Sequence, residues 1–312
     1  MGLGFLFPGQ GAQEVGMVGD IGAVEDAVYQ RFEEASDVLG FDLGDVVANG
    51  PAERLNETEV TQPALLTAGV ALLDVWRCRN GAEPEVVAGH SLGEYSALVA
   101  AGSLDFRSAV VLVHERGKLM QGAVPAGQGA MAAILGLDDE VVEESCEGID
   151  GTVTPANYNS SGQVVIAGAA PAVAAAIDAC KDRGARRAVP LDVSVPSHCA
   201  LMAPASEPLA ELLSNADIRD PVIPVVQNYS AVAATDRATI RDNLLRQLVS
   251  PVRWSASVGT MSRAGTDVFV ECGPGSVLAG LARRIDRSLA VHGIGTLDGL
   301  ESALEACAGL RS

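Results

Sequence analysis

The sequence predicts an α/β fold, in which a hydrolase-like core with a parallel sheet carries a smaller ferredoxin-like α+β subdomain. Short apolar runs alternate with segments of helical spacing along most of the 312 residues, which is typical of a parallel sheet covered by helices. One apolar run ends in a glycine-flanked serine just before a helical segment. A stretch with a different order of expected elements, bounded on both sides by glycine- and proline-rich segments, interrupts this pattern. We therefore expect a discontinuous large domain of residues 1–126 and 196–312, and a small subdomain of residues 127–195.

The elements expected before the interruption alternate in type. Apolar residues fill Gly2–Phe7 and Pro84–Ala88, which we predict to be buried strands. Thr61 is placed to cap one helix, and Pro63 suits the first turn of that helix. Helical spacing covers four segments, Asp20–Leu39, Thr61–Arg77, Leu92–Ala101 and Ser108–Met120.

The interrupting stretch predicts a β-α-β-α-β unit, which resembles a ferredoxin-like subdomain. Its strands are expected at Gly127–Leu135, Gly162–Ala167 and Arg187–Leu191, and its helices at Asp138–Glu144 and Ala170–Arg183.

The pattern of the large domain then returns. Helices are expected at Ala203–Ser214, Thr239–Leu248, Val252–Gly265 and Val277–Ile285. Strands are expected at Val222–Gln227 and Val268–Glu271.

Composition narrows the class of function. The net charge of −19 argues against nucleic acid as a partner, because phosphate binding needs a concentrated positive face. We see no apolar stretch long enough for a bilayer and no basic leader, so we expect a cytoplasmic protein that binds no membrane. We also expect a monomer. The cysteines have no metal-ligand spacing and predict no metal site: Cys78, Cys146, Cys180, Cys199, Cys272 and Cys307.

The sequence Gly89-His90-Ser91-Leu92-Gly93 fits the G-x-S-x-G pattern of a nucleophile elbow. An apolar strand precedes it and a helix follows, which is the context that the motif requires. The sharp turn brings flanking backbone together, so side chains at the two glycines would clash. Ser91 would then lie at a helix N-terminus, where free N–H groups face developing negative charge. The plain alternative is an ordinary Gly-Ser turn.

A serine nucleophile needs a base, and the chain has four histidines. His198 follows a proline-punctuated loop after a strand, where catalytic groups are often placed. His90 lies inside the elbow, His114 within an amphipathic helix, and His292 in an expected edge strand, so His198 is favoured. The group that orients its imidazole stays open between Asp192 and a backbone or amide carbonyl.

Two further features indicate acyl transfer. The turn Pro8-Gly9-Gln10-Gly11 follows the first strand, and its backbone N–H groups could form an oxyanion hole together with the N–H of Leu92. Arg116 lies late on a helix, where it is either a solvated arginine or, if it turns inward, a planar fork for a carboxylate. Such a fork would select acyl groups that carry a free carboxylate.

These residues together resemble the malonyl-CoA:acyl-carrier-protein transacylases of bacterial fatty-acid synthesis, and the resemblance covers nearly the whole chain. It rests on seven blocks in the family's order: Phe7–Gln13, Gly89–Leu98, Arg116–Gln121, Asn159–Gly168, Val195–His198, Gln247–Trp254 and Glu271–Gly275.

The resemblance implies a role for each site residue. Ser91 is the nucleophile, His198 the base and Arg116 the clamp for the malonyl carboxylate. Backbone N–H groups of Gln10 and Leu92 form the oxyanion hole. Gln247 orients His198 through a carbonyl, in place of an acid.

The implied reaction is ping-pong transfer of malonyl from malonyl-CoA to the phosphopantetheine thiol of holo acyl carrier protein, without a cofactor. The nearest alternative is the same chemistry in a discrete acyltransferase of a polyketide synthase or a malonate decarboxylase. A serine thioesterase or another hydrolase, and a non-catalytic carrier-binding module, are alternatives from other classes.

An acidic carrier needs a local positive surface on this acidic chain. The candidates for that surface are Arg183, Arg186, Arg187, Arg283, Arg284 and Arg287.

Overall fold

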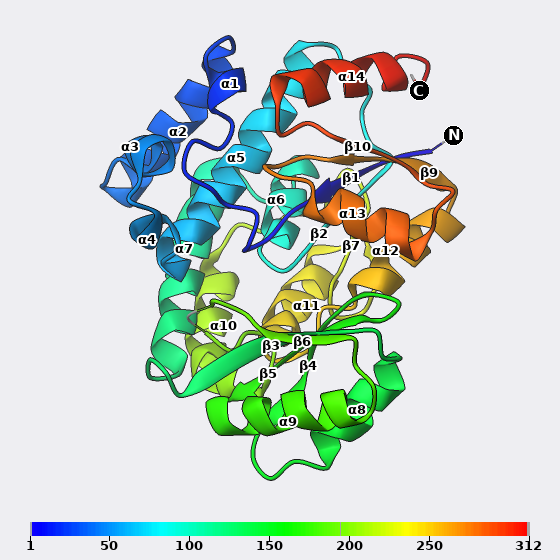
Figure 1. The fold of residues 1–312 in the computed structure, drawn as a ribbon. Helices are drawn as coiled ribbons and strands as arrows, with labels where there is room; N and C mark the ends of the chain where they lie inside the picture. Colours follow the sequence, from blue (N-terminus) through cyan, green and yellow to red (C-terminus); the bar gives the residue numbers. More distant parts are fainter. Residues whose placement is uncertain (1, 194, 311–312) are drawn as a thin grey trace.

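The large sheet forms the centre of the computed structural model, which describes residues 2–193 and 195–310 (Figure 1). Its strand order is β10-β9-β1-β2-β7-β8, and all neighbours pair in parallel except β7 and β8. The strands are β1 (Gly2–Phe7), β2 (Val86–Gly89), β7 (Val225–Val226), β8 (Ala233–Ala234), β9 (Thr266–Glu271) and β10 (Ala290–Gly293). The predicted α/β class with a parallel sheet is confirmed.

Helices cover both faces of this sheet because its central strand is apolar on both sides. Along β1, Phe5 and Phe7 pack into one core, whereas Leu6 packs into the other. The first core contains residues of α2 (Asp26–Leu39), α5 (Thr58–Cys78), α6 (Gly93–Ala100) and α7 (Phe106–Ala123). The second core contains residues of α12 (Trp254–Arg263) and α13 (Val277–Ile285).

The remaining helices of the large part are α1 (Gly19–Gly22), α3 (Leu43–Asn49), α4 (Ala52–Leu55), the 3-10 helix η1 (Ala200–Ala205), α10 (Ser206–Asn215), α11 (Arg237–Val249) and α14 (Leu297–Cys307). In the described part of the chain, no helix combines the length and apolar character that a membrane span needs.

The second sheet is antiparallel and has the order β4-β5-β3-β6. Helices α8 and α9 cover its outer face (Figure 1). Its elements follow the chain as β3 (Gly129–Leu135), α8 (Asp139–Glu147), β4 (Val153–Ser160), β5 (Gln163–Ala169), α9 (Ala170–Asp182) and β6 (Arg187–Pro190). This β-α-β-β-α-β order is ferredoxin-like. All of these elements fall within residues 127–195, whose assignment as a separate subdomain stays a prediction.

Strand β4 corrects the predicted β-α-β-α-β unit, which lacked it. The strand contains Pro155 and several polar residues, so its sequence has no apolar run. Proline is tolerated because β4 lies at the edge of its sheet. On its free side, Tyr158 donates its backbone N–H to the carbonyl of Val252 at 2.9 Å. A contact with the large part thus supports a strand that the local pattern did not reveal.

The capping role predicted for Thr61 is wrong. Helix α5 begins at Thr58, and Thr61 instead donates its buried hydroxyl to the Leu55 carbonyl at 2.6 Å. Pro63 therefore lies inside the helix, where it has no N–H to donate to the carbonyl of Glu59. His114 of α7 binds that carbonyl through Nδ1 at 2.7 Å. The two helices are thereby joined at a point where the proline would otherwise leave a carbonyl unpaired.

Two further boundaries differ from prediction. The helix expected at Asp20–Leu39 is divided into α1 and α2, and the strand expected at Val222–Gln227 is only Val225–Val226.

The register of β1 and β2 determines where the site lies. Phe7 is paired with Gly89 at the last position of both strands. Because the two strands are parallel, the turn after β1 and the turn after β2 both lie at the carboxyl ends of the strands, on the same side of the sheet. Strand β7 pairs with β2 at Val226 and Ala88, which brings Gln227 and Asn228 to this side as well.

Candidate active site

The turn after β2 is a strained elbow that presents Ser91. Ser91 has φ of 53°, a left-handed conformation that a residue with a side chain rarely adopts. A Cβ on Gly89 would lie 1.9 Å from the backbone carbon of Gly93, and one on Gly93 would lie 2.0 Å from the Phe7 carbonyl oxygen. Both glycines of the motif are therefore required by close backbone contacts, as the G-x-S-x-G geometry demands.

His198 meets this serine from a distant part of the chain. The Ser91 hydroxyl and His198 Nε2 are 2.7 Å apart, although the two residues are separated by 107 positions. His198 Nδ1 lies 2.7 Å from the main-chain carbonyl of Gln247 in α11. Since that carbonyl can only accept, Nδ1 carries the proton, and Nε2 has a lone pair for the serine hydroxyl.

The electrostatic surroundings keep His198 neutral. Burial, and then the nearby Arg116 guanidinium, lower the pKa of His198 to about 3. The imidazole is therefore an acceptor at neutral pH, the form that a general base needs.

The other histidines have different partners. His90 bonds through Nε2 to Asn159 Oδ1 of β4 at 2.9 Å, and His114 bonds to the Glu59 carbonyl. His292 lies in β10 at the edge of the large sheet. Asp192 is exposed, so its carboxylate is not the group that orients His198, and a main-chain carbonyl occupies that position.

The predicted oxyanion donors lie beside the serine. Gln10 and Leu92 line the same small cavity as Ser91 and His198. A Cβ on Gly9 would lie 2.3 Å from the carbonyl oxygen of His90, so the turn after β1 reaches the elbow only because glycine is present. Among the backbone hydrogen bonds of the described residues, none uses the N–H of Gln10 or Leu92 as donor. Both groups are available to a ligand.

Arg116 turns inward from α7 and is 1% exposed. Its two terminal nitrogens donate to Gln62 Oε1 at 2.7 Å and to Gln247 Oε1 at 3.0 Å. Within residues 2–193 and 195–310 it takes part in no ion pair, and its Nε has no hydrogen-bond partner. A buried guanidinium that contacts two neutral amides and, at 5.4 Å, the ring of Tyr95, but forms no ion pair in that part of the chain, is unusual, because burying a charge is costly unless it is paired. It lines the cavity of Ser91 and offers that cavity a positive charge.

Three buried residues at the site were not predicted. Gln62 of α5 positions Arg116, while Asn228 and Glu94 bond to each other and to the elbow. Asn228 Oδ1 accepts from the Ser91 N–H at 2.6 Å, and its amide nitrogen donates to the Gly89 carbonyl at 2.6 Å. Gln62 and Glu94 lie in helices that are mostly buried, and a polar residue in such a helix was the only local signal.

The cavity that contains these groups is small, with a volume of about 90 Å³. It suits a short acyl group rather than a long chain. In the described residues, no cluster of histidine, cysteine, aspartate and glutamate side chains is arranged to bind a metal ion.

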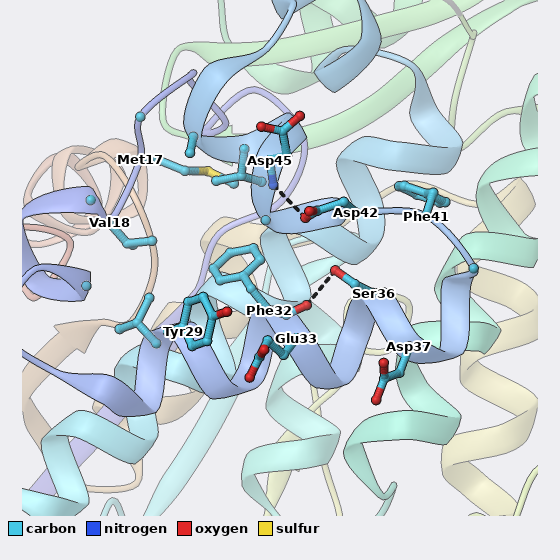
Figure 2. Close-up of a pocket in the computed structure, with 18 residues that line it drawn as sticks. Met17, Val18, Tyr29, Phe32, Glu33, Ser36, Asp37, Phe41, Asp42 and Asp45 are labelled. Carbon is cyan, nitrogen blue, oxygen red and sulfur yellow. Dashed lines mark hydrogen bonds between the residues drawn. The ribbon is translucent and has the colours of Figure 1, made fainter.

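A larger hollow of about 1010 Å³ lies between α1, α2 and α3 (Figure 2). Its walls include Tyr29, Phe32 and Phe41, with Glu33 and Asp42 beside them. No histidine, lysine or arginine is among its lining residues, so it offers neither a serine–histidine pair nor a cation for a substrate carboxylate. The chemistry therefore belongs to the smaller cavity.

Comparison with known proteins agrees with this geometry. Residues 4–296 match the model of the acyl transferase domain family. A malonyl CoA-acyl carrier protein transacylase of Escherichia coli strain K12 is 52% identical over 303 residues, covering 96% of this chain and 98% of that protein. One from Bacillus subtilis strain 168 is 44% identical over 306 residues, covering 97% of this chain and 96% of that protein.

Solved structures give the same result. An acyl carrier protein S-malonyltransferase from Vibrio cholerae superposes with a TM-score of 0.93 at 51% identity, covering 97% of this chain and 99% of that chain. A malonyl-transacylase in complex with its type II polyketide synthase acyl carrier protein superposes with a TM-score of 0.97 at 49% identity, covering 98% of this chain and 100% of that chain.

Proposed function

The chain belongs to the acyl transferase domain family, and we propose that it transfers a malonyl group from malonyl-CoA to the phosphopantetheine thiol of an acyl carrier protein. One observation carries the choice of acyl group. The buried Arg116, which has no acidic ion-pair partner among the described residues, lines the same 90 Å³ cavity as the Ser91–His198 pair. A malonyl thioester has a carboxylate for the arginine and, two carbons away, a carbonyl for the serine.

The first half-reaction acylates Ser91. His198 Nε2 takes the hydroxyl proton while Ser91 Oγ forms a bond to the thioester carbon. The resulting oxyanion faces the N–H groups of Gln10 and Leu92. The C–S bond then breaks, and the CoA sulfur leaves with the proton held by His198. The main-chain carbonyl of Gln247 stabilises the transient imidazolium.

The second half-reaction runs the same steps in reverse with a different thiol. His198 takes the proton of the carrier's phosphopantetheine thiol, whose sulfur attacks the malonyl ester. The C–O bond to Ser91 breaks, and His198 returns the proton to Oγ. Every group in this scheme belongs to the chain or its two substrates, so we expect no cofactor, and we propose that a monomer suffices.

A second candidate function has the same chemistry and differs only in the carrier protein that accepts the malonyl group. The structural relative bound to a type II polyketide synthase acyl carrier protein favours a test of polyketide carriers beside fatty-acid carriers. The cavity chemistry is the same for both, so the relative kcat/KM for the two kinds of holo carrier would decide between them. We propose the fatty-acid carrier as the principal acceptor.

The experiment that tests the function is intact-protein mass spectrometry after incubation with an equal mixture of malonyl-CoA and acetyl-CoA. The wild-type protein should gain one malonyl group, which disappears when holo carrier is added. Ser91→Ala should gain none, and Ser257→Ala, a buried serine of α12, should react as wild type does. A malonyl adduct on Ser91→Ala would reject the nucleophile. Malonate released equally fast with and without carrier would identify a hydrolase instead.

A further inference from the structure

Glu94 is a fully buried carboxyl group that the reaction scheme does not use. It lies in the first turn of α6, three residues after Ser91. Its Oε2 accepts from the Asn228 backbone N–H at 2.8 Å and from Gln247 Nε2 at 3.0 Å. Its Oε1 has no hydrogen-bond partner in the described part of the protein. An acidic side chain at 0% exposure with one oxygen unpaired is costly, so it calls for a reason.

The contacts of Glu94 orient the Gln247 side chain. Gln247 Nε2 donates to Glu94 and also to the Ser91 carbonyl at 2.9 Å, which leaves Oε1 to accept from Arg116 at 3.0 Å. An amide has one donor end and one acceptor end, so an acceptor at Glu94 determines which end faces the arginine. A single amide thus connects a buried carboxyl group to a buried guanidinium.

Few charges surround this pair. Arg116 of α7 is the cation that faces Glu94, and it acts to lower the pKa of the carboxyl group. The neighbouring Tyr95, also on α6, is neutral because burial raises its pKa to about 12. His198, from the loop before η1, is neutral because its pKa is lowered to about 3. Burial likewise lowers the pKa of His90, at the elbow. Asn228, after β7, and Gln247, on α11, contribute only uncharged groups.

We propose that Glu94 is a positioning residue that balances the charge of Arg116 in the empty site and takes up a proton on Oε1 when a malonyl carboxylate binds Arg116. The proton comes from solvent, and no covalent bond other than the O–H bond is formed. This inference rests on the proposed function, because it needs a substrate with a carboxylate. It makes Glu94 a determinant of specificity that does not itself contact the acyl group.

The physical reason for this proton uptake is that two carboxylates, those of Glu94 and of the substrate, would otherwise share the one buried cation of Arg116. Burial raises the pKa of Glu94 to about 7, against the opposing influence of its hydrogen bonds and of Arg116. A substrate carboxylate cancels the charge of Arg116 and so removes one of those opposing influences, which raises the pKa further. By linkage, ionising Glu94 must weaken binding of malonyl to the same extent, and it should leave an uncharged acetyl group unaffected.

The test compares kcat/KM for acylation by malonyl-CoA and acetyl-CoA across pH. Protonation of His198 and of CoA affects both substrates alike, so their ratio cancels those effects. In the wild-type protein the malonyl-to-acetyl ratio should fall at least about fivefold between about pH 6 and about pH 8.5. In Glu94→Gln, which keeps an acceptor for Asn228 and Gln247 but cannot ionise, the ratio should stay constant and match the low-pH value of wild type. A Glu94→Gln ratio that falls as in wild type would overturn the proposal.

A second measurement needs no change at Glu94. Calorimetry of CoA-ester binding to Ser91→Ala, in two buffers of different ionisation enthalpy near pH 7, counts the protons taken up. Malonyl-CoA should bind with net uptake and acetyl-CoA with none, whereas equal uptake for both would overturn the proposal. The proposed function fails separately, if wild-type protein forms no malonyl-Ser91. Protein that transfers malonyl but shows neither effect contradicts only the role of Glu94.

Discussion

At the scale of single residues, the site contains two kinds of group: a serine and a histidine placed to react, and a charged side chain placed to bind substrate. Ser91 and His198 lie 2.7 Å apart and form the proposed reacting pair. Arg116 faces the same cavity from another helix but is held by the neutral amides of Gln62 and Gln247. Because neither amide cancels its charge and no described residue forms an ion pair with it, the guanidinium can bind a substrate carboxylate. The proposed selection of the acyl group and the proposed chemistry of transfer therefore belong to separate side chains.

Replacing Arg116 should abolish the choice of acyl group while leaving a reactive serine. Arg116→Ala should lose preference for malonyl over acetyl by about 2 kcal/mol or more, because a charge-assisted contact in a buried site is lost. The measurement is the ratio of kcat/KM for malonyl-CoA and acetyl-CoA. Arg107→Ala, at an exposed position of the same helix, is the matched control. If the ratio is the same in Arg116→Ala and wild type, the arginine is not the clamp.

At the scale of elements, two parallel strands and the turns after them build the site. The pairing of Phe7 with Gly89 places the turn after β1 against the elbow after β2. Backbone atoms approach so closely there that Gly9, Gly89 and Gly93 have no room for a Cβ. The three glycines are therefore needed for close packing of the backbone, whereas the left-handed residue of the elbow is Ser91.

Adding one methyl group at the elbow should destabilise the whole protein. In Gly93→Ala the new Cβ would lie 2.0 Å from the Phe7 carbonyl oxygen, so β1 and α6 must separate. We expect a loss of about 3 kcal/mol in the free energy of unfolding, since a packed backbone cannot yield. Gly122→Ala in α7, where a Cβ meets nothing within 4 Å, should be neutral or stabilising by up to about 1 kcal/mol. Denaturant titration measures both. Equal stabilities for the two variants would contradict this account of the elbow.

At the scale of the whole molecule, the acidic chain needs a positive surface to receive an acidic carrier. The structure separates the six candidate arginines. Arg183 pairs with Glu144, and Arg283 donates to the Val291 carbonyl, so both have structural partners. Arg284 of α13 donates to Gln163 of β5 at 2.6 Å, which places a cation where the large part meets the small sheet. Arg186, Arg187, Arg284 and Arg287 are exposed and form no ion pair within the described residues, and of these four Arg284 is the one that bonds across to the other part.

Reversing charge at this boundary should impair only the second half-reaction. Arg284→Glu combined with Arg287→Glu should raise the KM for holo carrier about tenfold, because like charges then oppose docking. Acylation by malonyl-CoA should be unchanged. Arg54→Glu combined with Arg107→Glu makes the same change in net charge on other helices and serves as control. Steady-state kinetics with carrier varied is the measurement, and an unchanged KM for carrier would place docking elsewhere.

Much of the fold and family could be predicted because their signals are local. An apolar run predicts strand β1 and strand β2, and helical spacing predicts helix α13. The seven blocks identified the malonyl-CoA:acyl-carrier-protein transacylase family, and the comparisons confirm it. Strand β4 could not be predicted in this way, because a neighbouring strand and the Val252 carbonyl stabilise it rather than its own pattern. The roles assigned to the site residues stay predictions until variants are measured: Ser91, His198, Gln247, Gln10, Leu92 and Arg116.

The sequence by itself determined what depends on neighbours in the chain: the alternation of strands and helices, the elbow around Ser91, and the glycine turn after the first strand. Only the tertiary structure decided which distant groups meet. It brought Gln247 to His198 through a main-chain carbonyl, which no residue type can signal because every residue has one. It also placed Glu94 one amide away from Arg116. Buried charges interact through space at low dielectric, so their consequences depend on packing rather than on spacing along the chain.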